Sequence, residues 1–251
     1  MAKRVPGKEE FNETIRYFGR QIELTGVQLH LNRRVTSDEL NSGDFDEVII
    51  ATGIHPRVPP IPGIEHEKVL GYLDVLRDKQ PVGKNVAVIG AGGIGFDVSE
   101  YLAHSGPATS QDIEAFMSEW GIDMSLKARG GIEGVEPNVS ESPRQIFLLQ
   151  RKTSKVGDGL GKTTGWIHRA GLKKKGVKMM PGCEYVKVDD DGLHIKVGDE
   201  CRVLDVDNII LCAGQEPNRD LLENLTKPYH LIGGADLAAE LDAKRAIDHG
   251  V

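Results

Sequence analysis

The sequence predicts an α/β fold built around a parallel β-sheet, and three apolar stretches carry this prediction. Residues 85–89 form a short run rich in β-branched side chains, typical of a strand buried on both faces. Similar runs return at 145–150 and 206–213. Segments with helical spacing of apolar residues lie between them, at 96–102 and 166–175, and strands that alternate with helices favour a parallel sheet.

The first of these strands runs directly into a glycine motif, GAGGIG at residues 90–95, which has the form G-x-G-x-x-G. Gly90 allows the chain to turn sharply, and Gly92 lets backbone N–H groups reach a pyrophosphate without a Cβ in the way. Gly95 lets the following helix pack close to the strand, and the helix N-terminus favours phosphate charge. Because a predicted strand precedes the motif and a predicted helix follows it, the motif predicts a Rossmann-like dinucleotide-binding unit. A glycine-rich turn that binds nothing is the alternative.

The residues after the second strand indicate which dinucleotide is bound. In NAD-binding folds this position carries Asp or Glu, which hydrogen-bonds the ribose 2′-OH. Here Arg151 and Lys152 occupy it, with Lys155 nearby. Cations at this point form charge-assisted hydrogen bonds to a 2′-phosphate, so the sequence favours NADP(H) over NAD(H). The alternative is a pair of solvated surface charges.

Composition bounds the class of protein. The chain has 251 residues, 39% hydrophobic and 27% charged, which is ordinary for a globular protein. A net charge of −7 argues against nucleic acid as a partner. No apolar run approaches the roughly 20 residues of a membrane helix, and the first residues lack a signal-peptide core. Cys183, Cys201 and Cys212 form no C-x-x-C pair, so we expect a cytoplasmic protein without a disulfide framework or a metal site.

The remaining elements are expected from the periodicity of apolar residues and from the positions of glycine and proline. The expected helices cover residues 9–25, 69–79 and 111–120, and a last helix holds Leu237, Leu241 and Ile247. The expected further strands cover residues 27–31, 46–53, 177–180 and 230–236, with a hairpin pairing 185–188 and 193–197. Residues 105–143 are a long insertion, and its composition is equally compatible with a lid, an interface and a connector.

Two further motifs have ordinary interpretations. Residues 157–163, GDGLGKT, lack the first glycine of a phosphate-binding Walker loop, because Val156 stands there. Lys162 is a candidate to face the cofactor phosphates. The consecutive acids Asp189, Asp190 and Asp191 are interpreted as a solvated turn rather than a metal site.

Two strands end alike, in Ala-Thr-Gly at 51–53 and in Cys-Ala-Gly at 212–214. Together with the proline-rich crossover after residue 53, GAGGIG and GGAD at 233–236, they resemble the two-dinucleotide-fold flavoprotein disulfide reductases. The strings PRQIFLLQRK, GLGKTTGWIHR, DNIILCAGQEPNRDL and LIGGADLAAELDAKRAI resemble more closely the C-terminal part of bacterial NADPH-dependent 2,4-dienoyl-CoA reductases. The resemblance runs over essentially the whole chain.

The resemblance implies an organisation into domains. It places a partial FAD-binding domain at 1–81 and its C-terminal segment at 215–251, with a Rossmann-like NADPH-binding domain at 82–214 inserted between them. In that family a barrel with FMN and a 4Fe-4S cluster precede these domains, and electrons pass from NADPH through FAD to a dienoyl thioester. The chain carries neither the barrel nor the first FAD fingerprint, so we expect a fragment with weak or absent FAD binding that is not active alone. Its expected partner is that missing region of the same polypeptide.

The resemblance also assigns roles to residues. The pyrophosphate of NADPH is assigned to Gly90, Gly92, Gly93, Ile94 and Gly95, its 2′-phosphate to Arg151 and Lys152, and its nicotinamide end to Ala213 and Gly214. Contacts to FAD in the intact enzyme are assigned to Ala51, Thr52, Gly53, Ala235, Asp236 and Leu237. No acid–base catalyst is assigned, because hydride transfer between two cofactors needs positioning. A nucleotide-binding module of the ADP type with a structural role, as in amine-dehydrogenase relatives, is the second hypothesis. A stand-alone NADPH–flavin reductase is disfavoured by the missing FAD fingerprint.

Overall fold

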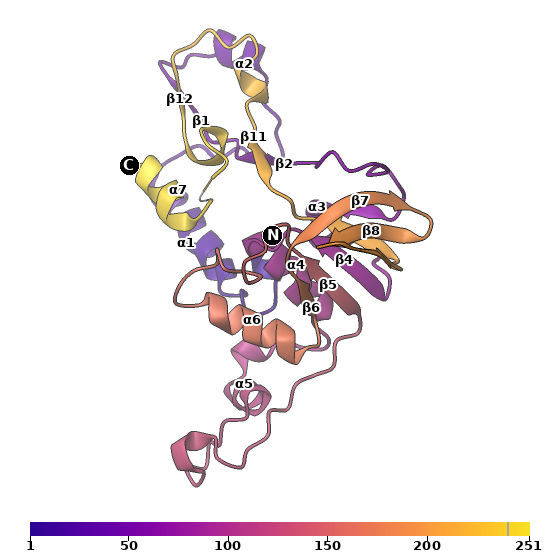
Figure 1. Cartoon of the computed structure of the whole chain (residues 1–251). Helices are drawn as coiled ribbons and strands as arrows, with labels where there is room; N and C mark the ends of the chain where they lie inside the picture. Colours follow the sequence, from indigo (N-terminus) through magenta and orange to yellow (C-terminus); the bar gives the residue numbers. More distant parts are fainter. Residues whose placement is uncertain (240) are drawn as a thin grey trace. The chain divides into compact units, whose positions relative to one another are not determined.

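The computed structural model describes residues 1–239 and 241–251, which fall into two compact units (Figure 1). The first unit contains Met1–Arg20 and Val58–Ala213, and the second contains Gln21–Arg57 and Gly214–Val251. These boundaries differ from the expected ones, because residues 1–20 and 58–81 pack in the first unit. Packing does not decide what each unit binds, so the assignment of cofactors to domains stays a prediction.

A five-stranded parallel sheet forms the centre of the first unit. Its strand order is β3-β10-β4-β5-β6, formed by Val69–Gly71, Asn208–Leu211, Asn85–Ile89, Gln145–Leu149 and Lys178–Met180. Ala87 of β4 pairs with Phe147 of β5 on one side and with Ile209 of β10 on the other. Residues 86–89 have no exposed surface, as expected for a central strand buried on both faces. The predicted parallel α/β fold is confirmed.

The two faces of this sheet are covered differently (Figure 1). On one face, Val86 and Val88 pack with the helix residues Phe96, Val98 and Leu102. The helices of this unit include α3 at Tyr72–Leu76, α4 at Gly93–Ala103 and α6 at Gly165–Lys174. On the other face, alternate sheet residues pack against an antiparallel meander, formed by β7 at Cys183–Asp189, β8 at Gly192–Val197 and β9 at Glu200–Leu204.

The insertion after α4 contains the helix that the sequence predicts. After a short 3-10 turn η2 (Thr109–Gln111), α5 covers Ile113–Trp120. It begins at the cap Asp112, whose side chain accepts a hydrogen bond from Ala115 N, and it ends at Gly121 in the left-handed conformation. Beyond α5 the carboxylate of Asp123 accepts hydrogen bonds from the backbone of Ser125, Lys127 and Ala128, just before η3 (Arg129–Gly131). Polar side chains of the insertion thus cap its helix and hold the turn that follows it.

The second unit has two small sheets. In one, β1 (Val48–Ile50) lies parallel to β12 (Tyr229–Leu231); in the other, β2 (Ile54–Pro56) is antiparallel to β11 (Gln215–Pro217). A small core joins Val48, Ile50 and Ala235. The short helical elements of this unit are α2 (Ser37–Ser42), η4 (Asp220–Leu222), η5 (Gly233–Ala235) and α7 (Ala243–His249).

Some predicted elements differ in the structure. Residues 27–31 form no strand, since every one of them is exposed and no described strand pairs with them. The predicted helix over 69–79 begins instead as β3, and only Tyr72–Leu76 are helical. Leu237 is exposed outside any helix, and of the three apolar residues assigned to the last helix only Ile247 lies in α7.

The helix predicted over residues 9–25 is confirmed as α1, Phe11–Thr25, and the turn η1 (Ala2–Arg4) precedes it. Among the residues that the structure describes, no helix has the length and apolar character needed to cross a bilayer.

Candidate functional site

The GAGGIG loop joins β4 to α4 at the carboxyl edge of the parallel sheet. Gly90 N donates to Leu149 O of β5 at 3.0 Å, and Cys212 N donates to Ile89 O at 2.8 Å. β5 and β10 therefore flank the end of β4 on opposite sides, so the strand order changes direction here. In open α/β sheets such a switch point opens the crevice in which ligands bind.

Contacts within the protein explain only two of the glycines in this loop. A Cβ on Gly90, whose φ is +107°, would lie 2.3 Å from Cys212 O, and one on Gly95 would lie 1.8 Å from Gly90 O. A Cβ on Gly92 or Gly93 would meet no atom within 4 Å. Packing therefore requires Gly90 and Gly95, whereas the space beside Gly92 and Gly93 is open.

This open space lies at the N-terminus of α4, where Gly92 is the cap residue and no side chain provides a capping hydrogen bond. The first amides of an 11-residue helix and its dipole together favour an anion at this position. A pyrophosphate fits both features, because it needs backbone donors and close approach without a Cβ. The residues present thus fit a dinucleotide.

The cations predicted to hold the 2′-phosphate lie at the end of the neighbouring strand. Arg151 and Lys152 follow β5 after one intervening residue, Gln150, and both are exposed. Within residues 1–239 and 241–251 neither side chain forms an ion pair with a carboxylate, and the same holds for Lys155 and Lys162. Burial raises the pKa of the nearby Tyr185 hydroxyl, and the positive charge of Arg151 opposes that shift. Among the described residues, the cations that follow β5, the strand next to β4, thus have no carboxylate partner.

The structure also brings together the residues predicted to contact FAD, all within the second unit. Thr52 Oγ1 donates to Asn218 O at 2.6 Å, and Asn218 N donates to Gly53 O at 2.9 Å. A Cβ on Gly234 would lie 3.3 Å from Gly53 Cα, which places the segment 233–236 against the end of β1 and the start of β2. The contacts of these residues to FAD stay a prediction.

Arg219 is a residue of this second cluster that the sequence reasoning missed. Its Nε donates to Ala235 O at 2.9 Å, and its guanidinium also bonds Asp236 O. The string QEPNRD at residues 215–220, which contains Arg219, is the part of the sequence that could have indicated it. Gly214 begins the second unit, and a Cβ there would lie 3.2 Å from the guanidinium of Arg57.

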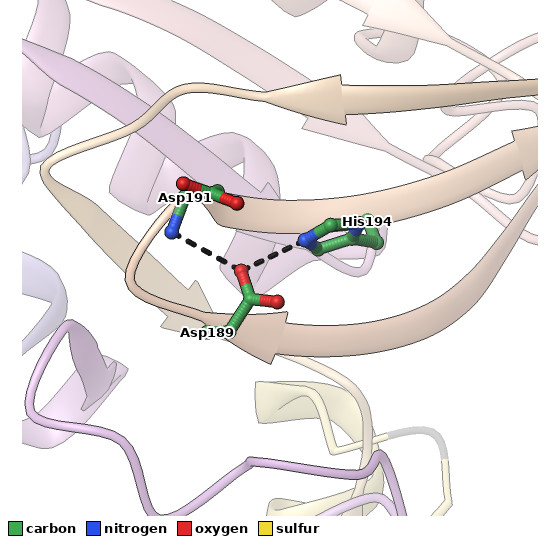
Figure 2. Close-up of side chains that lie close together, drawn as sticks. All are labelled: Asp189, Asp191 and His194. Atoms are coloured by element: carbon green, nitrogen blue, oxygen red, sulfur yellow. Dashed lines mark hydrogen bonds and ion pairs between the residues drawn. The ribbon is translucent and has the colours of Figure 1, made fainter.

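A third cluster lies at the β7–β8 turn (Figure 2). Ligand atoms of Asp189, Asp191 and His194 lie within 4.8 Å of one another. The two oxygens of Asp189 are already engaged, one by His194 Nε2 at 2.8 Å and the other by Lys187 Nζ at 2.6 Å. Hydrogen bonds from Lys187 and His194 lower the pKa of Asp189 to about 2. The cluster has the contacts of an ion-paired turn.

Comparisons with known proteins agree with this fold. Residues 6–238 match the model of the pyridine nucleotide-disulphide oxidoreductase family. A metal reductase of Desulforamulus reducens is 26% identical over 229 residues, which are 90% of this chain and 33% of that protein. The chain therefore spans about a third of the length of this relative.

Two solved structures share the fold of the whole chain. A 2-naphthoyl-CoA reductase complex superposes with a TM-score of 0.77 at 22% identity, covering 99% of this chain and 32% of the other. Histamine dehydrogenase from Rhizobium sp. 4-9 superposes with a TM-score of 0.73 at 17% identity, covering 99% and 36%. The family match covers nearly the whole chain, and the glycine loop lies at the expected sheet edge. The chain belongs to the pyridine nucleotide-disulphide oxidoreductase family, whose members are oxidoreductases that bind FAD and NAD(P).

Proposed function

We propose that this chain binds NADPH at the carboxyl edge of its five-stranded sheet and is the electron-entry module of a multi-cofactor flavoprotein reductase. One observation carries the proposal: the open space beside Gly92 and Gly93 follows β4, and the neighbouring strand β5 is followed by two cations, Arg151 and Lys152, that pair with no carboxylate among the described residues. A glycine loop alone suits any dinucleotide, whereas these cations suit one with a 2′-phosphate.

Each part of the site has its own role in binding the dinucleotide. The amides that begin α4 donate to the pyrophosphate, and Arg151 and Lys152 hold the 2′-phosphate. Ala213, which follows β10 at the switch point, offers a small side chain where the nicotinamide end would lie. When bound, NADPH supplies a hydride to the flavin of the same enzyme. The chain contributes binding and orientation, for which no proton donor is required.

The substrate of the whole enzyme is a further part of the proposal. The strings PRQIFLLQRK and GLGKTTGWIHR support a 2,4-dienoyl-CoA thioester as the final electron acceptor. On this proposal FMN and a 4Fe-4S cluster belong to a barrel region of the intact polypeptide. The segments at 51–53 and 235–237 contact FAD there, and this chain alone holds FAD weakly or not at all.

The proposal is tested by titrating the wild-type chain with NADPH, NADH and ADP, and by repeating the titrations with Gly92→Ala. A Cβ at Gly92 meets no protein atom, and its φ of −84° suits alanine, so the variant should fold normally. It should nonetheless bind NADPH about tenfold or more weakly, since a single charge-assisted hydrogen bond is worth about 1.5–3 kcal/mol.

Gly19→Ala is the matched control, because a Cβ there also meets nothing, in a helix remote in sequence from the loop. It should bind NADPH as the wild type does. Wild-type affinity for NADPH in Gly92→Ala would contradict the proposed location. Binding of ADP without any preference for NADPH would favour a structural nucleotide site.

A further inference from the structure

Gln150, the residue between β5 and the two cations, organises the loop that carries them. We propose that Gln150 is a positioning residue, which holds Arg151 and Lys152 in the arrangement that recognises a 2′-phosphate without touching the cofactor itself. The inference rests on the proposed function and names a determinant of its cofactor specificity.

The side-chain amide of Gln150 bonds the loop at three points. Its Nε2 donates to Lys152 O at 3.0 Å and to Ser154 O at 2.9 Å, while its Oε1 accepts from Gly157 N at 3.4 Å. Carbonyl oxygens only accept and a backbone N–H only donates, so these partners fix the orientation of the amide group. One carboxamide thus ties residues 152, 154 and 157 to the end of β5.

The ends of this loop are held independently of Gln150. Lys152 O also accepts from Gly182 N at 2.9 Å, and Gly157 O accepts from Arg169 Nη1 at 2.9 Å. Gly157 also lies against α4, since a Cβ there would be 2.5 Å from the ring of Phe96. Between residues 151 and 156, Gln150 is the one side chain in the described part of the protein that bonds the loop backbone. It therefore controls the middle of the loop.

Loss of these bonds should affect one cofactor and spare the other. A loosened loop must be ordered again when a 2′-phosphate binds, and that ordering reduces the affinity for NADPH. NADH carries only a neutral 2′-hydroxyl at this position and no phosphate, so its binding should depend much less on the order of residues 151–156. The discrimination ratio, the Kd for NADH divided by the Kd for NADPH, therefore reports on positioning, whereas a general loss of stability would weaken both.

The experiment compares Gln150→Met with Gln145→Met by titration with NADPH and NADH. Methionine has similar length and no hydrogen-bonding amide, and Gln145 is an exposed residue at the opposite end of the same strand. We expect Gln150→Met to lower the discrimination ratio about five- to tenfold, the size of one or two neutral hydrogen bonds, and Gln145→Met to leave it unchanged. An unchanged ratio in Gln150→Met would overturn the inference.

A double-mutant cycle separates this inference from the proposed function. In the background Arg151→Ala/Lys152→Ala there is nothing left to position, so Gln150→Met should change the ratio no further. A full additional loss in that background would contradict positioning. If the wild type itself shows no preference for NADPH, the proposed function fails; if it does and Gln150→Met retains it, only the role of Gln150 fails. Should Gln150→Met not fold, Gln150→Ala, which lets water reach the freed carbonyls, provides the same readout.

Discussion

Arg151→Ala/Lys152→Ala should lower the affinity for NADPH by at least about 100-fold, because it removes two charge-assisted contacts worth about 1.5–3 kcal/mol each. Both side chains are exposed, and neither forms an ion pair within residues 1–239 or 241–251, so their removal costs the fold no such contact. The affinity for NADH should stay the same or rise slightly. The measurement is a fluorescence titration of each variant with both dinucleotides at fixed ionic strength, since screening weakens such contacts.

Lys173→Ala/Lys174→Ala provides the matched control for this charge change. It removes two adjacent, exposed cations from the last turn of α6, which runs from the carboxyl edge of the sheet back toward its amino edge. We expect it to retain most of the affinity for NADPH. Equal losses in the two double variants would show that the protein attracts NADPH through its overall charge and not through a defined phosphate site.

Gly95→Ala should destabilise the first unit by about 3 kcal/mol or more, at the upper end of what overpacking costs. Its Cβ would lie 1.8 Å from Gly90 O and 2.9 Å from Gly90 C, both backbone atoms that cannot rotate away. Relief requires moving α4 away from the end of β4, and with it Phe96, which is almost completely buried. Urea unfolding followed by circular dichroism measures the effect.

Gly93→Ala is the control for stability, because a Cβ there meets no atom within 4 Å in the same helix. Alanine favours a helix over glycine by about 1 kcal/mol, so this variant should be as stable as the wild type or more so. Similar unfolding midpoints for Gly95→Ala and Gly93→Ala would contradict the close contact between strand and helix at this loop.

The inner strands of the sheet were predictable because they are largely buried, whereas the edge strand β3, which is only partly buried, was predicted as part of a helix. Residues 85–89 and 145–149 are short apolar runs, and a run of that kind has few other places in a fold. β9 was missed because it is short and four of its five residues are exposed, so its sequence carries no run of buried apolar residues. Residues 27–31 led to the opposite error: their alternating apolar residues predict a strand, but such a segment forms one only where another strand pairs with it.

The sequence shows the candidate site only as motifs, and the roles of its residues stay predictions. Glycines at fixed spacing and cations close after a strand can be recognised in a sequence, and the strand order then brings the ends of β4 and β5 to one edge. The tasks of Gln150 and Arg219 depend on which backbone carbonyls their side chains meet, and those contacts arise from loop conformation. Local pattern carries no information about such contacts, so only the folded chain reveals them.

Amide hydrogen exchange with and without saturating NADP⁺ tests the central claim most directly. If the dinucleotide binds at the carboxyl edge of the sheet, exchange should slow at residues 90–95 and 150–155 and stay unchanged at the turn of residues 187–194. Protection confined to other segments, or none at any concentration of NADP⁺, would contradict the account.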